Sequence, residues 1–204
     1  MTSDHNESSG PDPAFEPPGK GYSLFVVMFY GAMTIVAMFL AWLFGVPSLW
    51  RTDPGPPGPI PEWLGLTLGI LLGLATHGVS TFVRKRFGWT QGFYEKIRRL
   101  MGSPTSGQVA ITAAASAIGE EVLFRGTLLP LIGLFPQAML FGLMHMGPGK
   151  EMRFWPFYAA LMGVALGLLY QASGSLLAPV VAHFTVNYFG LSSLRQRADD
   201  ETAH

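Results

Sequence analysis

The 204-residue chain contains no cysteine and few charged side chains. The lack of cysteine excludes disulfides and thiolate chemistry. Only 13% of the residues are charged and 49% are hydrophobic, whereas a soluble domain carries about 25% charged residues. The 13 Lys and Arg balance 13 Asp and Glu, and no basic patch points to nucleic acid as a partner. This composition indicates that much of the chain is surrounded by lipid.

Five long segments contain no charged residue. They are Gly21–Trp50, Trp63–Val83, Leu100–Gly119, Gly126–Gly149 and Phe154–Leu194. A helix needs roughly 20 apolar residues to cross the hydrocarbon core of a bilayer. Each of the first three segments is therefore predicted to form one membrane span.

The fourth and fifth uncharged segments contain helix breakers. Pro130, Gly133 and Pro136 predict that the fourth begins with a reentrant turn, followed by a short helix from about Pro136. The fifth is long enough for two helices separated near Gly174. We therefore predict an all-α fold, a polytopic transmembrane helical bundle with about six membrane spans.

The remaining segments are polar or rich in proline. Residues 1–19 are predicted to form a disordered polar tail, residues 20–194 a single transmembrane domain and residues 195–204 a polar C-terminal tail. The connector Pro47–Pro61 is too rich in Pro and Gly to be helical. Arg84–Arg99 holds six basic residues among aromatic ones, and its second half is predicted to be an interfacial helix on an anionic leaflet.

The basic residues predict the orientation in the membrane. With the N-terminus inside, eleven Lys and Arg fall on the inner side and only Arg51 falls in an outer loop. By the positive-inside rule, both termini are cytoplasmic. We expect a multi-pass protein of the cell membrane, most simply the inner membrane of a bacterium.

Three charged side chains interrupt the apolar sequence between Leu100 and Gly149. They are Glu120, Glu121 and Arg125. Each costs about 2.5–3.5 kcal/mol at membrane depth, so such residues usually face the interior of a bundle and have a function. Glu121 and Arg125 are four residues apart and can pair on one helix face. Glu120 points about 100° away and lacks a partner nearby in the sequence, which a purely structural ion pair does not explain.

Two histidines in apolar segments are predicted to reach the depth of Glu120. His145 shares a helix face with Phe141, and His183 shares one with Asn187. At 1.5 Å per residue, both histidines lie about 13 Å from the outer ends of their helices. A carboxylate between imidazoles can act as a general base on water. Alternatively, Glu120, His145 and His183 can ligate Zn²⁺ and leave one position for water. Either chemistry is hydrolytic.

The polar residues form three ordered motifs. Glu120–Arg125 reads EExxxR, Phe141–His145 reads FxxxH and His183–Asn187 reads HxxxN. This set resembles the CPBP family of membrane proteins over about Gly107–Leu194. That family includes type II CAAX prenyl proteases and bacteriocin-processing or self-immunity (Abi-type) proteins.

The resemblance implies a role for each motif residue. Glu120 and His145 would activate water, and His183 and Asn187 would stabilise the oxyanion. Supporting the site would be Glu121, Arg125 and Phe141. The resemblance implies an intramembrane endopeptidase that acts on a membrane-associated protein or peptide, without a cofactor, and zinc ligation is the alternative.

Two other functions fit parts of the pattern. A catalytically silent family member would act as a membrane immunity or scaffold protein, but every motif position is present. A proton-coupled transporter could use Glu120 and the histidines as a relay. Transporters often contain repeated halves with paired broken helices, which this sequence does not display. Both alternatives rank below the peptidase.

Overall fold

The computed structural model describes residues 18, 19, 21–51 and 60–202, and the predicted disordered tail falls almost entirely outside this part. The helices are α1 (Tyr22–Leu43), α2 (Glu62–Arg86), α3 (Gln91–Met101), α4 (Ser106–Glu121), α5 (Leu129–Ile132), α6 (Leu134–Met144), α7 (Trp155–Ser173) and α8 (Leu177–Thr202). Short 3₁₀ helices cover Gly88–Thr90 and Lys150–Met152, and a π-helix, η3, covers Val122–Leu128. The described residues form no strand, so the all-α prediction is confirmed.

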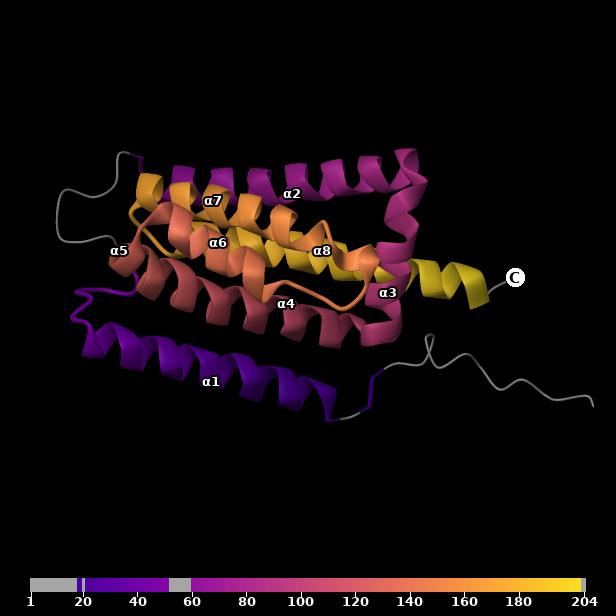
Figure 1. Ribbon diagram of the computed structural model, residues 1–204, viewed down its shortest axis with the longest axis horizontal. Coiled ribbons are helices and arrows are strands. Elements are labelled where there is room, and N and C mark those ends of the chain that lie inside the picture. Colours follow the sequence, from indigo (N-terminus) through magenta and orange to yellow (C-terminus); the bar gives the residue numbers. More distant parts are fainter. Residues whose placement is uncertain (1–17, 20, 52–59, 203–204) are drawn as a thin grey trace, which may run out of the picture.

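The long helices lie side by side and α3 crosses one end of the bundle (Figure 1). The helix α1 begins, and α8 ends, at the end of the bundle where α3 lies (Figure 1). The short α5 and the turn between α7 and α8 lie at the opposite end (Figure 1). The arrangement therefore places the two ends of the helical chain on the same side of the bundle.

The helix that carries the paired glutamates runs without interruption from Ser106 to Ile132 through α4, η3 and α5. It starts with a capping box, in which the Gln108 backbone N–H donates to Thr105 Oγ1 at 3.3 Å. Gly133 ends it with a φ of +87°, a conformation that favours glycine. Glu120 lies in the middle of this helix.

The helix after Gly133 begins two residues earlier than predicted. Its first residue is Leu134 rather than Pro136. Proline is tolerated in the first turn because the N–H groups there have no partner within the helix. Pro136 therefore lies inside the helix and does not mark its beginning.

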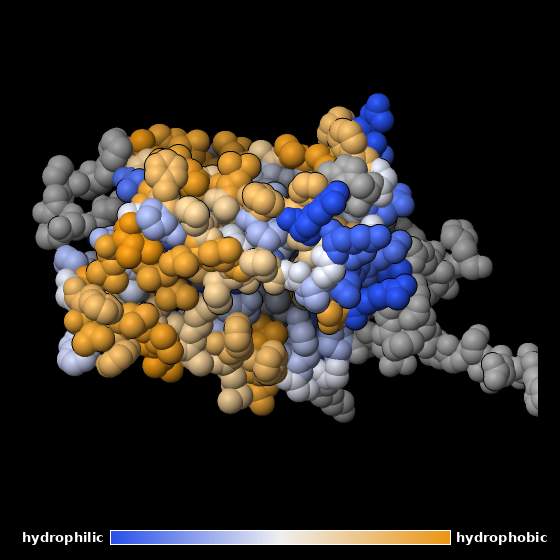
Figure 2. Space-filling model, in the orientation of Figure 1, coloured by the Kyte–Doolittle hydropathy of each residue, from blue (hydrophilic) through white to orange (hydrophobic). Residues whose placement is uncertain are grey.

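Apolar side chains cover the outside of the bundle. α1, α2 and the segment Lys150–Ser173 are long and apolar enough to cross a membrane. Large apolar side chains point outward from α1, with Trp42 75% exposed. Figure 2 shows a hydrophobic surface along the bundle and hydrophilic residues gathered near α3. This is the surface of a membrane protein.

The remaining predicted spans differ from a simple crossing. With 11 residues, α6 is about 16 Å long, too short for a hydrocarbon core of about 30 Å. The predicted break near Gly174 is confirmed, because Gly174 ends α7 with a φ of +66°. The segment 195–204, predicted as a tail, continues α8 as far as Thr202. The count of six spans stays a prediction.

Three glycines bring α2 close to α8. Gly65, Gly69 and Gly73 are four residues apart and buried. A Cβ at Gly69 would lie 2.6 Å from the carbonyl oxygen of Ala178, and one at Gly73 would lie 2.5 Å from Thr185 Cβ. Small residues at this spacing let membrane helices approach closely. They hold α2 against the helix that carries His183.

Candidate active site

Glu120 lies between the two histidines predicted to join it. Its Oε2 atom is 3.7 Å from His183 Nε2 and 3.9 Å from His145 Nε2. Both separations exceed hydrogen-bond length, and Oε2 is buried without a hydrogen-bond partner among the described residues. The convergence of the three side chains, from α4, α8 and the end of α6, is therefore observed.

The second nitrogen of each histidine determines which ring atom faces Glu120. His145 Nδ1 lies 2.7 Å from the backbone oxygen of Phe141. A carbonyl oxygen only accepts, so Nδ1 carries the hydrogen and donates it. His183 Nδ1 lies 2.7 Å from Glu121 Oε1, and this carboxylate accepts in the same way. Both imidazoles thus turn Nε2 toward Glu120.

Glu121 and Arg125 form the predicted ion pair. Arg125 Nη1 donates to Glu121 Oε1 at 2.7 Å, and both side chains are fully buried. Arg125 Nη2 also donates to the carbonyl oxygen of Gly163 on α7 at 3.3 Å. The pair therefore links α4 and η3 to α7, and through His183 it also reaches α8.

Phe141 fills the space beside the ion pair and the histidines. Its ring lies 4.6 Å from the Arg125 guanidinium and 4.6 Å from the His145 ring. It meets His183 edge-on at 6.0 Å. Phe141 therefore packs against both imidazoles, and its supporting role stays a prediction. His145 lies just past the end of α6, where its ring still contacts Phe141.

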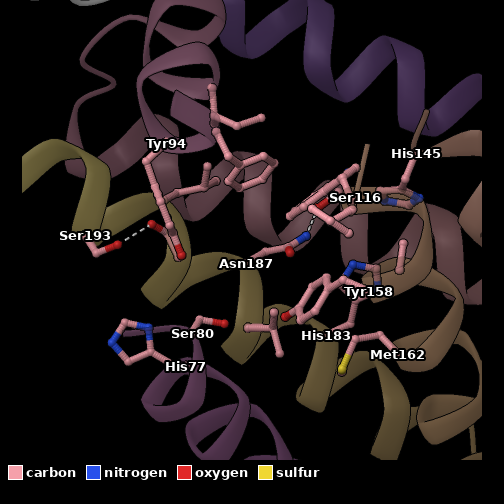
Figure 3. Close-up of a pocket in the computed structure, with 18 of the residues that line it drawn as sticks. His77, Ser80, Tyr94, Ser116, His145, Tyr158, Met162, His183, Asn187 and Ser193 are labelled. Atoms are coloured by element: carbon pink, nitrogen blue, oxygen red, sulfur yellow. Dashed lines mark hydrogen bonds between the residues drawn. The ribbon is translucent and has the colours of Figure 1, made fainter. Parts of the chain in front are cut away.

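Asn187 has a partner that the sequence analysis missed. Its Nδ2 donates to Ser116 Oγ on α4 at 2.9 Å, and Ser116 Oγ donates to the carbonyl oxygen of Ala113. Figure 3 shows Asn187 and Ser116 joined in this way, near His145 and His183. Ser116 orients the amide, and no motif marked it because serine is common in apolar helices.

Two further polar residues near the site were also missed. Gln137 is fully buried, and its Nε2 donates at 3.1 Å to the Gly163 carbonyl that Arg125 uses. An uncharged polar residue inside an apolar segment was a signal that could have identified Gln137. Tyr30 on α1 interacts with the Glu120 carboxyl, and a tyrosine in a membrane helix offers no such signal.

The four predicted catalytic residues line one cavity. Its volume is about 450 Å³, and its wall includes Glu120, His145, His183 and Asn187. Most of the remaining lining is apolar and comes from α2, α3, α7 and α8. The cavity extends from Glu120 toward the end of the bundle that α3 crosses, so an extended molecule can reach the site from there.

The zinc alternative needs closer donor atoms than the site provides. At bond lengths of about 2.0–2.2 Å, ligands in a tetrahedral zinc site lie about 3.4 Å apart. Both distances from Glu120 to the histidines are longer. Among the residues that the structure describes, no three His, Asp or Glu side chains form a group that could hold a metal ion. The separations of Glu120 from the two histidines are therefore longer than those of a tetrahedral zinc site.

The sequence matches a family model at the segment that builds this site. Residues 103–189 match the model described as Type II CAAX prenyl endopeptidase Rce1-like. All seven predicted site residues lie inside the matched range. The match covers less than half of the chain, and over that segment the chain is similar to this family. The Rce1-like family is a protease family, which supports a peptidase function at the level of class.

A curated protein similar to this chain is the uncharacterized protein YpbD of Bacillus subtilis. The two are 26% identical over 127 residues, which is 61% of this chain. The match spans 64% of the length of YpbD. No solved structure matches the chain.

Proposed function

We propose that this protein is an intramembrane endopeptidase that hydrolyses a peptide bond with a water activated by Glu120 and His145. The observation that carries the proposal is the buried Glu120 Oε2 atom, which has two imidazole Nε2 atoms at 3.7 and 3.9 Å and no hydrogen-bond partner among the described residues. A single water can bridge polar groups at such separations.

Glu120 is the general base in this mechanism. A water between Glu120 Oε2 and His145 Nε2 gives one proton to the carboxylate, and its oxygen forms a bond to the peptide carbonyl carbon. His145 accepts the second hydrogen of this water in a hydrogen bond, because its Nδ1 hydrogen is already engaged by Phe141. The protonated Glu120 then transfers its proton to the leaving amine.

His183 and Asn187 stabilise the oxyanion. Asn187 uses one N–H for Ser116, which leaves its second amide hydrogen for the substrate. His183 donates from Nε2 when it is protonated on both nitrogens, and Glu121 at Nδ1 stabilises the charge of the imidazolium. Fixed donors of this kind lower the barrier most when they point to the developing charge.

The substrate we propose is a protein or peptide embedded in or attached to the membrane. The cavity is lined mostly by apolar side chains and reaches the end of the bundle near α3, which suits a chain that enters from the membrane surface. We propose that the protein lies in the cell membrane with both termini in the cytoplasm. We propose no nucleic-acid partner and no metal.

A comparison of cells that carry wild-type protein or Glu120→Gln tests the proposal. The amide keeps the size and hydrogen bonding of Glu120 but cannot accept the proton. We expect membrane peptides to accumulate uncleaved in the variant, detected by mass spectrometry of their termini. Glu95→Gln, on the exposed face of α3, is the matched control and should leave the peptides cleaved. Identical peptide termini in the wild type and Glu120→Gln would refute peptidase activity.

A further inference from the structure

Arg84 is the only Lys or Arg among the described residues that line the cavity. It lies in the last turn of α2. Its guanidinium stacks over the Tyr94 ring at 5.1 Å, and its Nη1 donates to Ser193 Oγ at 3.4 Å. Its Nε is buried and has no hydrogen-bond partner in the described part of the chain. The cavity thus holds a cation that is only partly satisfied.

Arg84 stands at a defined distance from the proposed catalytic centre. Figure 3 shows Tyr94 and Ser193 on the opposite side of Asn187 from His145 and His183. His183 and Ser193 are ten residues apart on α8, or about 15 Å along a helix. An extended peptide advances about 3.3 Å per residue. Four or five peptide residues therefore cover this distance.

The chemistry of Arg84 selects an anion with oxygen atoms. A guanidinium presents its N–H groups in a planar fork that matches the two oxygens of a carboxylate. The guanidinium carbon lies over the Tyr94 ring, which restricts the positions that the guanidinium can take. A hydroxyl at 3.4 Å is a long hydrogen bond and satisfies one N–H weakly. A carboxylate that enters the cavity can therefore replace or complete these contacts.

We propose that Arg84 is a specificity-determining residue that binds a carboxylate of the peptide substrate, four or five residues from the bond that is cleaved. This inference rests on the proposed peptidase function and names its substrate class. The carboxylate has two possible sources of the same chemistry, an acidic side chain or the free end of the peptide chain.

A synthetic peptide mixture tests the inference. Every position varies among Leu, Ala, Asp and Lys, and the mixture is made once with free carboxyl ends and once with amidated ends. The wild-type protein in detergent cleaves it, and mass spectrometry reads the sequence around each cleaved bond. We expect carboxylates four or five residues from that bond to be favoured over Lys by about ten-fold to a hundred-fold, as for a hydrogen bond to a charged group. If the free chain end provides the carboxylate, amidation should remove the preference. If the Asp side chain provides it, the preference should remain after amidation.

Variants at Arg84 show whether this residue causes the preference. Arg84→Gln should still cleave but lose the preference, and Arg84→Glu should favour Lys at the same position. Arg84→Lys keeps the charge without the fork and should retain a weaker preference, even if the other variants fold poorly. The control is Arg86→Gln, an exposed residue of the same helix end that does not line the cavity. It should keep the wild-type pattern.

Three outcomes are separable. Cleavage by the wild type without a preference for carboxylates would overturn the inference and leave the peptidase intact. An unchanged preference in a folded Arg84→Gln variant would do the same. Absence of cleavage by the wild type, in this mixture and in cells, would remove the proposed function itself, and the inference with it.

Discussion

Glu120 and Glu121 are neighbours in the chain, and Glu120 is largely and Glu121 fully buried, but their side chains have different partners. Glu121 Oε1 accepts hydrogen bonds from Arg125 Nη1 and His183 Nδ1, each at 2.7 Å. Glu120 Oε2 has only distant imidazole nitrogens. Because adjacent residues point about 100° apart on a helix, one carboxylate can hold the structure while the other remains available for chemistry.

The proposed role of Glu120 as a base can be tested against its alternative role as a zinc ligand. In the proposed mechanism Glu120 is a base, so a chelator should leave activity unchanged and the purified protein should contain no stoichiometric metal. Glu120→Gln should lower turnover by about 10²–10⁴-fold, as expected for lost acid–base catalysis. Elemental analysis and a peptidase assay with and without chelator measure both. Stoichiometric zinc that disappears together with activity in Glu120→Gln would instead make Glu120, His145 and His183 ligands.

Asn187 and Ser116 allow a second residue-scale test. Asn187→Ala should lower kcat by about 10²–10³-fold with little change in KM, because it removes one oxyanion donor. Ser116→Ala should have the same type of effect but a smaller one, since Asn187 keeps its amide and loses only its orientation. Steady-state kinetics on one peptide substrate, with folding checked by gel filtration, compares them. If both variants raise KM equally and leave kcat unchanged, both residues act in substrate binding.

At the scale of the helix, the contact between α2 and α8 determines whether the cavity keeps its shape. Gly69 faces the Ala178 backbone, so a larger side chain must push the helices apart. Overpacking of this kind costs about 1–3 kcal/mol. The buried glycines Gly65, Gly69 and Gly73, spaced four residues apart, are the ones at which a larger side chain should disturb this contact.

We expect Gly69→Leu to lower the thermal stability of the purified protein and its activity. Gly78→Leu is the matched control, because a Cβ at Gly78 meets no atom within 4 Å. The control should behave like the wild type in a thermal-shift measurement in detergent. If both variants are equally stable, α2 and α8 are not packed as closely as described.

The elements also show what a sequence can predict. The Glu121–Arg125 pair and the break at Gly174 depend on nearby residues, and both were predicted. The contacts of Asn187 with Ser116 and of Gln137 with Gly163 join residues 71 and 26 positions apart. No local pattern contains such pairs. The π-helix η3 was also missed. The four-residue spacing of Gly65, Gly69 and Gly73, in contrast, is visible in the sequence, and the close helix contact that it favours was not predicted.

At the scale of the molecule, the apolar surface runs along the helix bundle and the polar residues gather at its end near α3 (Figure 2). The beginning of α1, the end of α8 and α3 lie at the same end of the bundle (Figure 1). This agrees in geometry with the predicted topology, in which the termini share a side. Which side this is follows only from the distribution of Lys and Arg.

Reporter fusions test the orientation directly. Fusions after Arg99 and at the C-terminus should report a cytoplasmic location, and a fusion within Pro47–Pro61 should report the outside. The reason is the excess of eleven basic residues to one. An external location for Arg99 would reverse the orientation without changing the site chemistry.

The short α6 has a consequence for hydration. It ends at Met144, about 16 Å from its start, and the chain is not helical again until Lys150. This stretch begins at the level of Glu120, where lipid cannot satisfy the polar groups of an irregular backbone. Such backbone is stable only beside protein or water. We therefore propose that water enters the bundle along this stretch and reaches Glu120, as the proposed hydrolysis requires.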